Sequence, residues 1–132
     1  MIPGQRNFGK LFDLSGQVTL ITGAGAGFGE ALAVGFAEPG CNGAVADVNL
    51  DSGRRTAEKL RKRGRQSVAV GADVWSPDAI KAMVNAVVRE FGRIDILVNS
   101  AGISQHAAAL DLSGGSWDRV VDVNLRGTFL CC

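Results

Sequence analysis

A glycine-rich segment, Thr22–Gly29, reads TGAGAGFG and directly follows the apolar run Val18–Ile21. Backbone without a Cβ can approach a pyrophosphate closely, and the free N–H groups and positive dipole end of a following helix stabilise its charge. A strict GxGxxG that starts at Gly23 fails at Phe28, whereas the looser pattern GxxxGxG fits. Lysine is absent from the segment, which excludes the phosphate loop of NTPases. The segment predicts a dinucleotide site; the alternative is a tight strand-to-helix turn whose glycines meet steric needs only.

The second candidate residue is Asp47, which ends the next apolar run, Gly43–Asp47. A carboxylate at the tip of the second strand can accept hydrogen bonds from the adenosine ribose hydroxyls, and it repels the 2′-phosphate of NADP. Asp47 therefore predicts NAD as the cofactor and disfavours NADP. The alternative is a strand-ending aspartate that only caps a turn. Arg54 and Arg55 could receive a 2′-phosphate, but they lie further along, in the following helix.

Strand and helix patterns alternate along the chain, which is typical of a parallel sheet. Strands are predicted over Val18–Thr22, Ala44–Asp47, Ser67–Val70 and Ile94–Asn99. Helices are predicted over about Gly27–Glu38, over about Asp51–Arg63, from Pro77 behind the cap residue Ser76 to about Phe91, and from about Ser116 to the chain end. Residues 1–15 are expected to form an N-terminal arm, and residues 16–132 an NAD-binding domain.

Two of these helices are expected to pack through one apolar face. On the first, that face would carry Phe28, Leu32, Gly35 and Phe36, with Gly35 allowing close packing on the sheet. On the last, it would carry Trp117, Val120, Val121 and Thr128, and Asn124 shares it. A buried amide costs free energy unless it is hydrogen-bonded, so Asn124 requires structural partners, bound water or a catalytic role.

The composition is that of an ordinary globular protein of one domain at most, because 46% of the 132 residues are hydrophobic and 20% are charged. The net charge of +1 gives no field that would attract nucleic acid. The basic stretch Arg54–Arg65 has no interleaved aromatic residue and is expected to be a solvated helix face. With no apolar run of membrane-spanning length and no signal peptide, a cytoplasmic protein without a membrane partner is expected. Cys41, Cys131 and Cys132 lack metal-ligand spacing, so neither a metal site nor a disulfide framework is predicted.

Five short motifs occur in the order and rough spacing of the short-chain dehydrogenase/reductase family, which the chain resembles over nearly its whole length. They are TGAGAGFG, ADVN at Ala46–Asn49, ADV at Ala72–Val74, NSAG at Asn99–Gly102 and VNLRG at Val123–Gly127. The resemblance implies an α/β fold, a Rossmann-type doubly wound parallel sheet that is incomplete, with strand order 3-2-1-4. It also implies an NAD(P)-dependent oxidoreductase that moves hydride between nicotinamide and a small-molecule secondary alcohol or ketone, as a homo-oligomer (dimer or tetramer).

The resemblance assigns a role to each matching position. The pyrophosphate turn would be shaped and lined by Gly23, Gly25, Ala26, Gly27, Phe28 and Gly29. The adenosine end of the cofactor would be held by Asp47, Val48, Asp73 and Val74, and its ribose side lined by Asn99, Ala101 and Gly102. Asn124 would belong to the catalytic group and hold a water in the proton relay.

The chain departs from the family pattern in two ways. Ser100 stands where the family usually repeats asparagine, a small change because serine also serves as a short hydrogen-bonding residue. More important, the 132 residues contain no tyrosine, whereas the family's chemistry needs a serine and a Tyr-x-x-x-Lys pair. The sequence is therefore expected to be the N-terminal part of an enzyme, inactive alone and prone to self-association. The alternatives are a non-catalytic nucleotide-binding or interaction module and, less favoured, an S-adenosylmethionine-binding domain. His106 is expected on an exposed loop, not as a base.

Overall fold

A parallel sheet forms the centre of the computed structural model, which describes residues 11–132. Within these residues the strands are β1 (Val18–Thr22), β2 (Asn42–Asp47), β3 (Ser67–Gly71) and β4 (Ile96–Asn99). They lie in the order β3-β2-β1-β4, and every neighbouring pair is parallel. The predicted strand order 3-2-1-4 is thus confirmed. Of the predicted N-terminal arm, residues 1–10 lie outside the described part of the chain.

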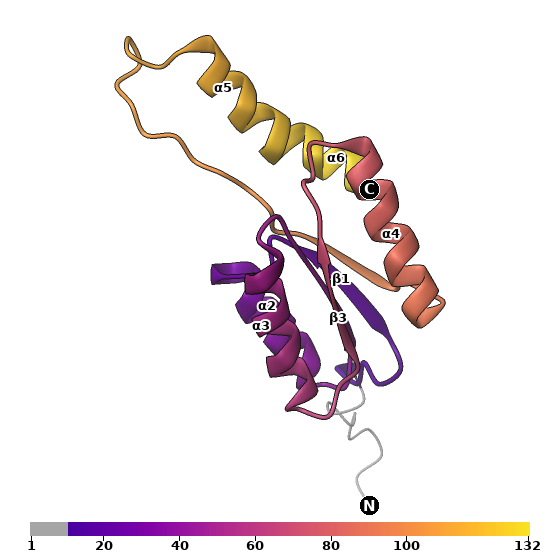
Figure 1. Cartoon of the computed structure of the whole chain (residues 1–132). Coiled ribbons are helices and arrows are strands. Elements are labelled where there is room, and N and C mark those ends of the chain that lie inside the picture. Colours follow the sequence, from indigo (N-terminus) through magenta and orange to yellow (C-terminus); the bar gives the residue numbers. More distant parts are fainter. Residues whose placement is uncertain (1–10) are drawn as a thin grey trace, which may run out of the picture.

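Helices cover both faces of the sheet, as Figure 1 shows, so the predicted doubly wound α/β architecture is confirmed. The helices are α2 (Gly27–Ala37), α3 (Leu50–Arg61), α4 (Pro77–Phe91), α5 (Gly114–Val121), the π-helical turn η1 (Asp122–Arg126) and α6 (Gly127–Cys131). α2 and α3 lie on one face and α4 on the other. Ser76 caps α4 as predicted, because its side chain accepts a hydrogen bond from the Ala79 N–H. In residues 11–132 no helix has the length and apolar character to cross a membrane.

The core consists of two layers because successive strand residues point to opposite faces of the sheet. Toward α4 the buried cluster contains Val18, Leu20, Ala44, Ala46, Ala72, Ile80, Met83 and Val87. Toward α2 and α3 it contains Ile21, Ala24, Ala33, Ala37, Val45, Ala57 and Leu60. The packing is close, because a Cβ at Gly43 would overlap Leu60. Burial of each large aliphatic side chain contributes about 1.5–3 kcal/mol.

The face of α2 that packs on the sheet differs from the predicted one. Phe28 is 87% exposed and Leu32 is 42% exposed, and the space around Gly35 is open in the described part of the chain. The buried residues are Gly29, Ala33 and Ala37, which recur every four residues along the helix. Small residues let the helix axis come close to the sheet beside the glycine turn. The prediction therefore failed for Phe28, Leu32 and Gly35, whereas Phe36 is half-buried and packs against the core as predicted.

Strand β4 begins at Ile96 and not at Ile94 as predicted. Just before it, the Asp95 side chain, and not a backbone carbonyl, accepts the hydrogen bond from the Val18 N–H. The Val18 N–H donates to Oδ2 of Asp95 at 2.8 Å, while the Asp95 N–H donates to the Val18 carbonyl at 2.9 Å. The Arg93 guanidinium donates to both oxygens of the same carboxylate. This carboxylate therefore joins the start of β1 to the approach to β4.

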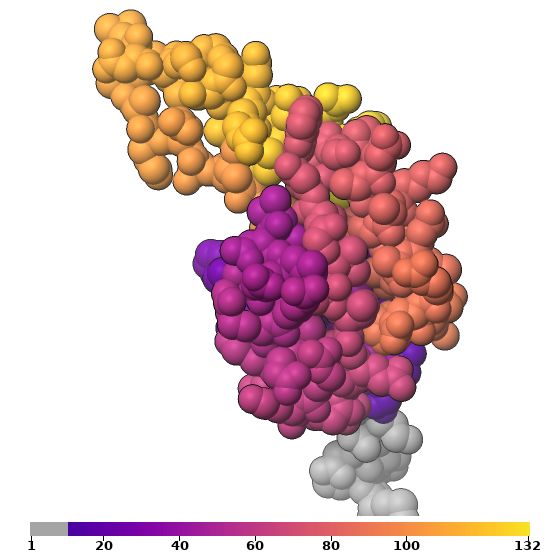
Figure 2. Space-filling view, in the orientation of Figure 1, coloured from indigo at the N-terminus to yellow at the C-terminus, as the bar shows by residue number. Residues whose placement is uncertain are grey.

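The predicted last helix is correct in place but wrong in detail. It begins at Gly114 behind Ser113, whose hydroxyl accepts from the Ser116 N–H, and it contains the π-helical turn η1. Figure 2 shows that the segment from the loop after β4 through α5 stands away from the body of the molecule. Trp117, expected on a packed face, is 60% exposed. Contact with the body begins with Val123 and Gly127, which are buried.

We predict that the Asp95 carboxylate makes stability depend on pH. Hydrogen bonds from Arg93 and then from the Val18 N–H hold the pKa of Asp95 below its ordinary value of 3.8. Its contribution to the free energy of unfolding should therefore be complete above about pH 4 and be lost as the pH falls through the folded-state pKa. Urea unfolding of wild type and Asp95→Asn from pH 7 to pH 2.5 tests this. The difference should shrink on acidification.

Asp111→Asn is the matched control, because its carboxylate accepts no hydrogen bond within residues 11–132 and lies on the exposed loop. It should unfold like the wild type at every pH. A gap between wild type and Asp95→Asn that is independent of pH would show that the carboxylate does not stabilise the fold through its charge.

Candidate functional site

A cavity of about 370 Å³ lies where the carboxyl ends of β1, β2 and β4 meet. Because parallel strands end at one edge of the sheet, the loops that follow them converge there. The strand order reverses between β1 and β4, which makes this edge the topological switch point of the sheet. We call the cavity at this edge the strand-end cavity. It is lined by Gly23, Ala26, Gly27, Phe28, Gly29, Asp47, Val48, Ser100 and Gly102. The structure thus brings together eight of the predicted site residues, and Ser100 with them.

The glycine turn after β1 is shaped by backbone that other residues would not adopt. Gly23 and Gly27 have φ angles of 65° and 58°, in the left-handed region that favours glycine. A Cβ at Gly23 would also lie 2.6 Å from the Cα of Ala101, so the turn packs directly against the NSAG segment. The cap residue of α2 is Ala26, which supplies no side-chain hydrogen bond to the first helical turn in the described structure. The first turn of α2, whose residues line the cavity, therefore has no side-chain cap from this position.

Asp47 serves two neighbouring segments at once. Its Oδ2 accepts a hydrogen bond from the Gly25 N–H at 2.8 Å, and its Oδ1 accepts one from the Asn49 N–H at 2.8 Å. The side chain of Asn49 in turn caps α3 by accepting from the Ser52 N–H at 3.0 Å. The turn-capping role considered for Asp47 is therefore present, and the same carboxylate also lines the cavity.

Thr22 is a site residue that the sequence analysis missed. Its buried hydroxyl accepts hydrogen bonds from the N–H groups of Ser100 and Ala101, both at 3.2 Å. This side chain holds the NSAG turn against the end of β1. The signal was available in the sequence, because Thr22 places a hydroxyl at the end of a buried strand, and most buried hydroxyls are hydrogen-bonded.

Asn124 was expected on a buried helix face, but the structure places it at an exposed position of η1. Its carboxamide forms a pair of hydrogen bonds with the backbone of Ile103, accepting from the N–H at 2.8 Å and donating to the carbonyl at 2.9 Å. The hydroxyl of Thr128 donates to the Asn124 carbonyl at 2.8 Å. Of the three roles considered for the amide, the structure thus shows structural partners.

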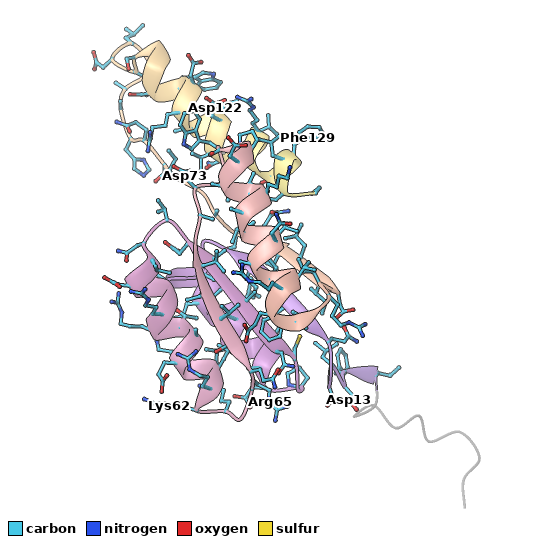
Figure 3. The ribbon with its side chains drawn as sticks, turned by 45° about the vertical axis from the view of Figure 1, so that its right-hand side comes forward. Asp13, Lys62, Arg65, Asp73, Asp122 and Phe129 are labelled. Carbon is cyan, nitrogen blue, oxygen red and sulfur yellow. The ribbon has the colours of Figure 1, made fainter. Side chains whose placement is uncertain are left out.

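The remaining predicted residues do not line the strand-end cavity. Gly25 lies against Asp47 and Ala101 against Gly23, while Asp73 and Val74 follow the end of β3, with Val74 close to Gly127. In Figure 3 Asp73 and Asp122 lie toward the same end of the molecule. Asn99 donates weakly to Cys132 at 3.5 Å, and its Oδ1 is buried without a partner in the described residues.

Other candidate chemistry is not assembled in the structure. His106 lies exposed on the loop after β4, as predicted. The three cysteines are free thiols, and burial raises the pKa of both Cys41 and Cys131. Over residues 11–132, no group of three or more His, Cys, Asp or Glu side chains is placed to hold a metal ion.

Comparison with known proteins is consistent with this geometry. Residues 17–132 match the short chain dehydrogenase family. The chain is 39% identical to a (2S)-[(R)-hydroxy(phenyl)methyl]succinyl-CoA dehydrogenase subunit of Thauera aromatica, over 89% of this chain and 48% of that protein. A short-chain type dehydrogenase/reductase from Mycobacterium marinum superimposes with a TM-score of 0.89 at 38% identity, covering 92% of this chain and 49% of that one. An NAD⁺-bound xylitol dehydrogenase superimposes with a TM-score of 0.86 at 34% identity, covering 89% and 46%.

The chain spans about half the length of the curated relatives it matches. Over that half, the sheet order, the glycine turn and the cavity at the strand ends agree with the family match. The chain belongs to the short-chain dehydrogenase family.

Proposed function

We propose that this chain forms the cofactor-binding part of an NAD-dependent oxidoreductase that moves hydride between nicotinamide and a small secondary alcohol or ketone. The observation that carries the proposal is the Asp47 carboxylate, which lies in the strand-end cavity beside the glycine turn. The bound cofactor would supply the hydride acceptor or donor. The residues of this chain would bind and orient it.

The strand-end cavity suits a dinucleotide on steric and polar grounds. Positions 23, 25 and 29 leave no room for a side chain, so the backbone itself would contact the pyrophosphate. A carboxylate offers about four lone-pair positions, and two on Asp47 are taken by the Gly25 and Asn49 N–H groups. The others remain for ribose hydroxyls. The bound cofactor of the xylitol dehydrogenase structure supports the same choice of NAD.

The charges around the strand-end cavity favour NAD over NADP. Its lining residues in the described structure include Asp47 but neither lysine nor arginine. Arg54 forms an ion pair with Asp51 at 2.9 Å, and Arg55 donates to the Ser52 hydroxyl at 2.7 Å. Figure 3 places Lys62 and Arg65 at the opposite end of the molecule from Asp73, which follows the carboxyl end of β3. A 2′-phosphate would therefore lie close to the Asp47 carboxylate, and no lysine or arginine among the lining residues would neutralise its charge.

The roles of Asn124, Asp73, Val74, Asn99 and the other predicted contacts stay predictions, as do the oligomeric state and a cytoplasmic location. A second candidate function is a nucleotide-binding or interaction module without catalysis. It is favoured by one observation, that residues of this chain line the strand-end cavity while the 132 residues contain no tyrosine. Binding and turnover distinguish the two candidates.

We predict that the purified protein binds NADH at least about tenfold more tightly than NADPH, a difference of ~1.4 kcal/mol. The reason is repulsion between the Asp47 carboxylate and the 2′-phosphate. Fluorescence titration with both nucleotides measures it, and Asp47→Ala should reduce the ratio. Asp111→Ala, which removes an equal charge from the exposed loop, should leave the ratio unchanged. Tighter binding of NADPH to the wild type would overturn the assignment.

We predict that Asn124→Ala destabilises the loop after β4. The change removes both partners of the Ile103 backbone, at a cost of about 0.5–1.5 kcal/mol for the exposed pair. The unfolding free energy and hydrogen exchange of the Ile103 amide report it. Asn85→Ala, an equal change on an exposed position of α4, is the control. Equal protection of the Ile103 amide in wild type and Asn124→Ala would contradict the assignment.

We also predict that a polypeptide of these 132 residues binds NADH without turning over. It has no tyrosine to take the proton of an alcohol while hydride moves to the cofactor. The assay combines the polypeptide, NAD and a panel of secondary alcohols, with a no-protein control. Turnover that survives repurification would show that another residue acts as the base.

A further inference from the structure

Three segments meet at the α-carbon of Gly25. A Cβ there would lie 2.8 Å from Cγ and Oδ2 of Asp47 and 2.8 Å from Cβ of Ser52. Its φ angle is outside the left-handed region, so the requirement for glycine is one of space and not of backbone conformation. The loop after β1, the end of β2 and the start of α3 thus close on a position that accepts no side chain.

The same carboxylate joins these segments by hydrogen bonds. The Gly25 N–H donates to one oxygen of Asp47 and the Asn49 N–H to the other, and the Asn49 side chain caps α3 at Ser52. A charged acceptor strengthens such bonds relative to a neutral one. These interactions are made by the chain's own groups, and they tie the glycine turn to the end of β2 and the start of α3.

We propose that Gly25 is a specificity-determining residue that acts through Asp47. Because Gly25 has no side chain, the carboxylate can lie against the turn and fix it while it also faces the ribose position. Asp47 is then a positioning residue for the turn as well as a ribose contact. Selectivity for the ribose and affinity for the pyrophosphate are coupled through one side chain. This inference rests on the proposed function.

Gly25→Ala tests the proposal without changing any charge. One added methyl group would overlap both the carboxylate and Ser52. If it displaces the carboxylate, the variant should bind NADH at least about tenfold more weakly, and its preference for NADH over NADPH should fall toward unity. Gly35→Ala is the matched control, since the space around Gly35 is open in the described structure and its φ is ordinary. It should bind both nucleotides like the wild type.

The double variant Gly25→Ala/Asp47→Ala separates coupling from two independent effects. If the methyl group acts by displacing the carboxylate, the double variant should bind NADH no more weakly than the weaker single variant. Losses that multiply, or a Gly25→Ala variant that keeps the nucleotide preference of the wild type, would overturn the proposal.

A measurement on the cofactor-free protein keeps this test distinct from that of the proposed function. By NMR, hydrogen exchange at the Gly25 amide should be slow in the wild type and at least about tenfold faster in Asp47→Ala. In Asp47→Asn, which keeps the size of the side chain, the NH₂ group cannot accept a hydrogen bond, so hydrogen exchange should become faster at either the Gly25 or the Asn49 amide. The Asp47→Asn variant tests the proposal if Gly25→Ala does not fold.

Fast exchange at the Gly25 amide in the wild type would overturn the positioning role even if NADH binds. Slow exchange in a protein that binds neither nucleotide would refute the proposed function, yet it would leave the link between Asp47 and the turn supported. The two failures therefore have different signatures.

Discussion

The close approach of three backbone segments at the carboxyl end of β1 is the constraint on which the site depends. β1 is buried along its whole length and is paired with β2 on one side and β4 on the other. The chain leaving it must turn within the narrow space between the loops of its two neighbours. Gly23 meets Ala101 on the β4 side, and Gly25 meets Asp47 on the β2 side. Side chains are excluded there, so this part of the strand-end cavity is lined by backbone.

The side-chain hydrogen bonds around this turn come from the polar residues that end β1 and β2. Thr22 ends β1 and holds the turn after β4, while Asp47 ends β2 and holds the turn after β1. The ends of β1 and β2 thus each hold a loop that follows a neighbouring strand. Hydrogen bonds within the protein that order such loops lower the ordering cost that a ligand would otherwise have to offset.

Much of this arrangement could be predicted from the sequence because local patterns control it. β1 has the predicted bounds, the cap of α4 is correct, and the glycine turn and Asp47 line one cavity. The predictions failed where contacts between residues far apart in the sequence determine the structure. The packed face of α2 depends on how near the sheet lies, which selects Ala33 over Leu32. The start of β4 depends on Asp95 meeting Val18, and the partner of Asn124 is a backbone segment far from it in the sequence.

The π-helical turn η1 places one extra residue in the last helix. A residue in an α-helix accounts for about 100° of rotation, so the faces of α5 and α6 are out of phase with each other. Trp117 can therefore face solvent while Leu130 and Cys131 reach the core beside α4. Deletion of a single residue within 122–126 would return the segment to a regular helix. The two halves would then share one phase, and either α6 would leave the core or α5 would swing to a new direction.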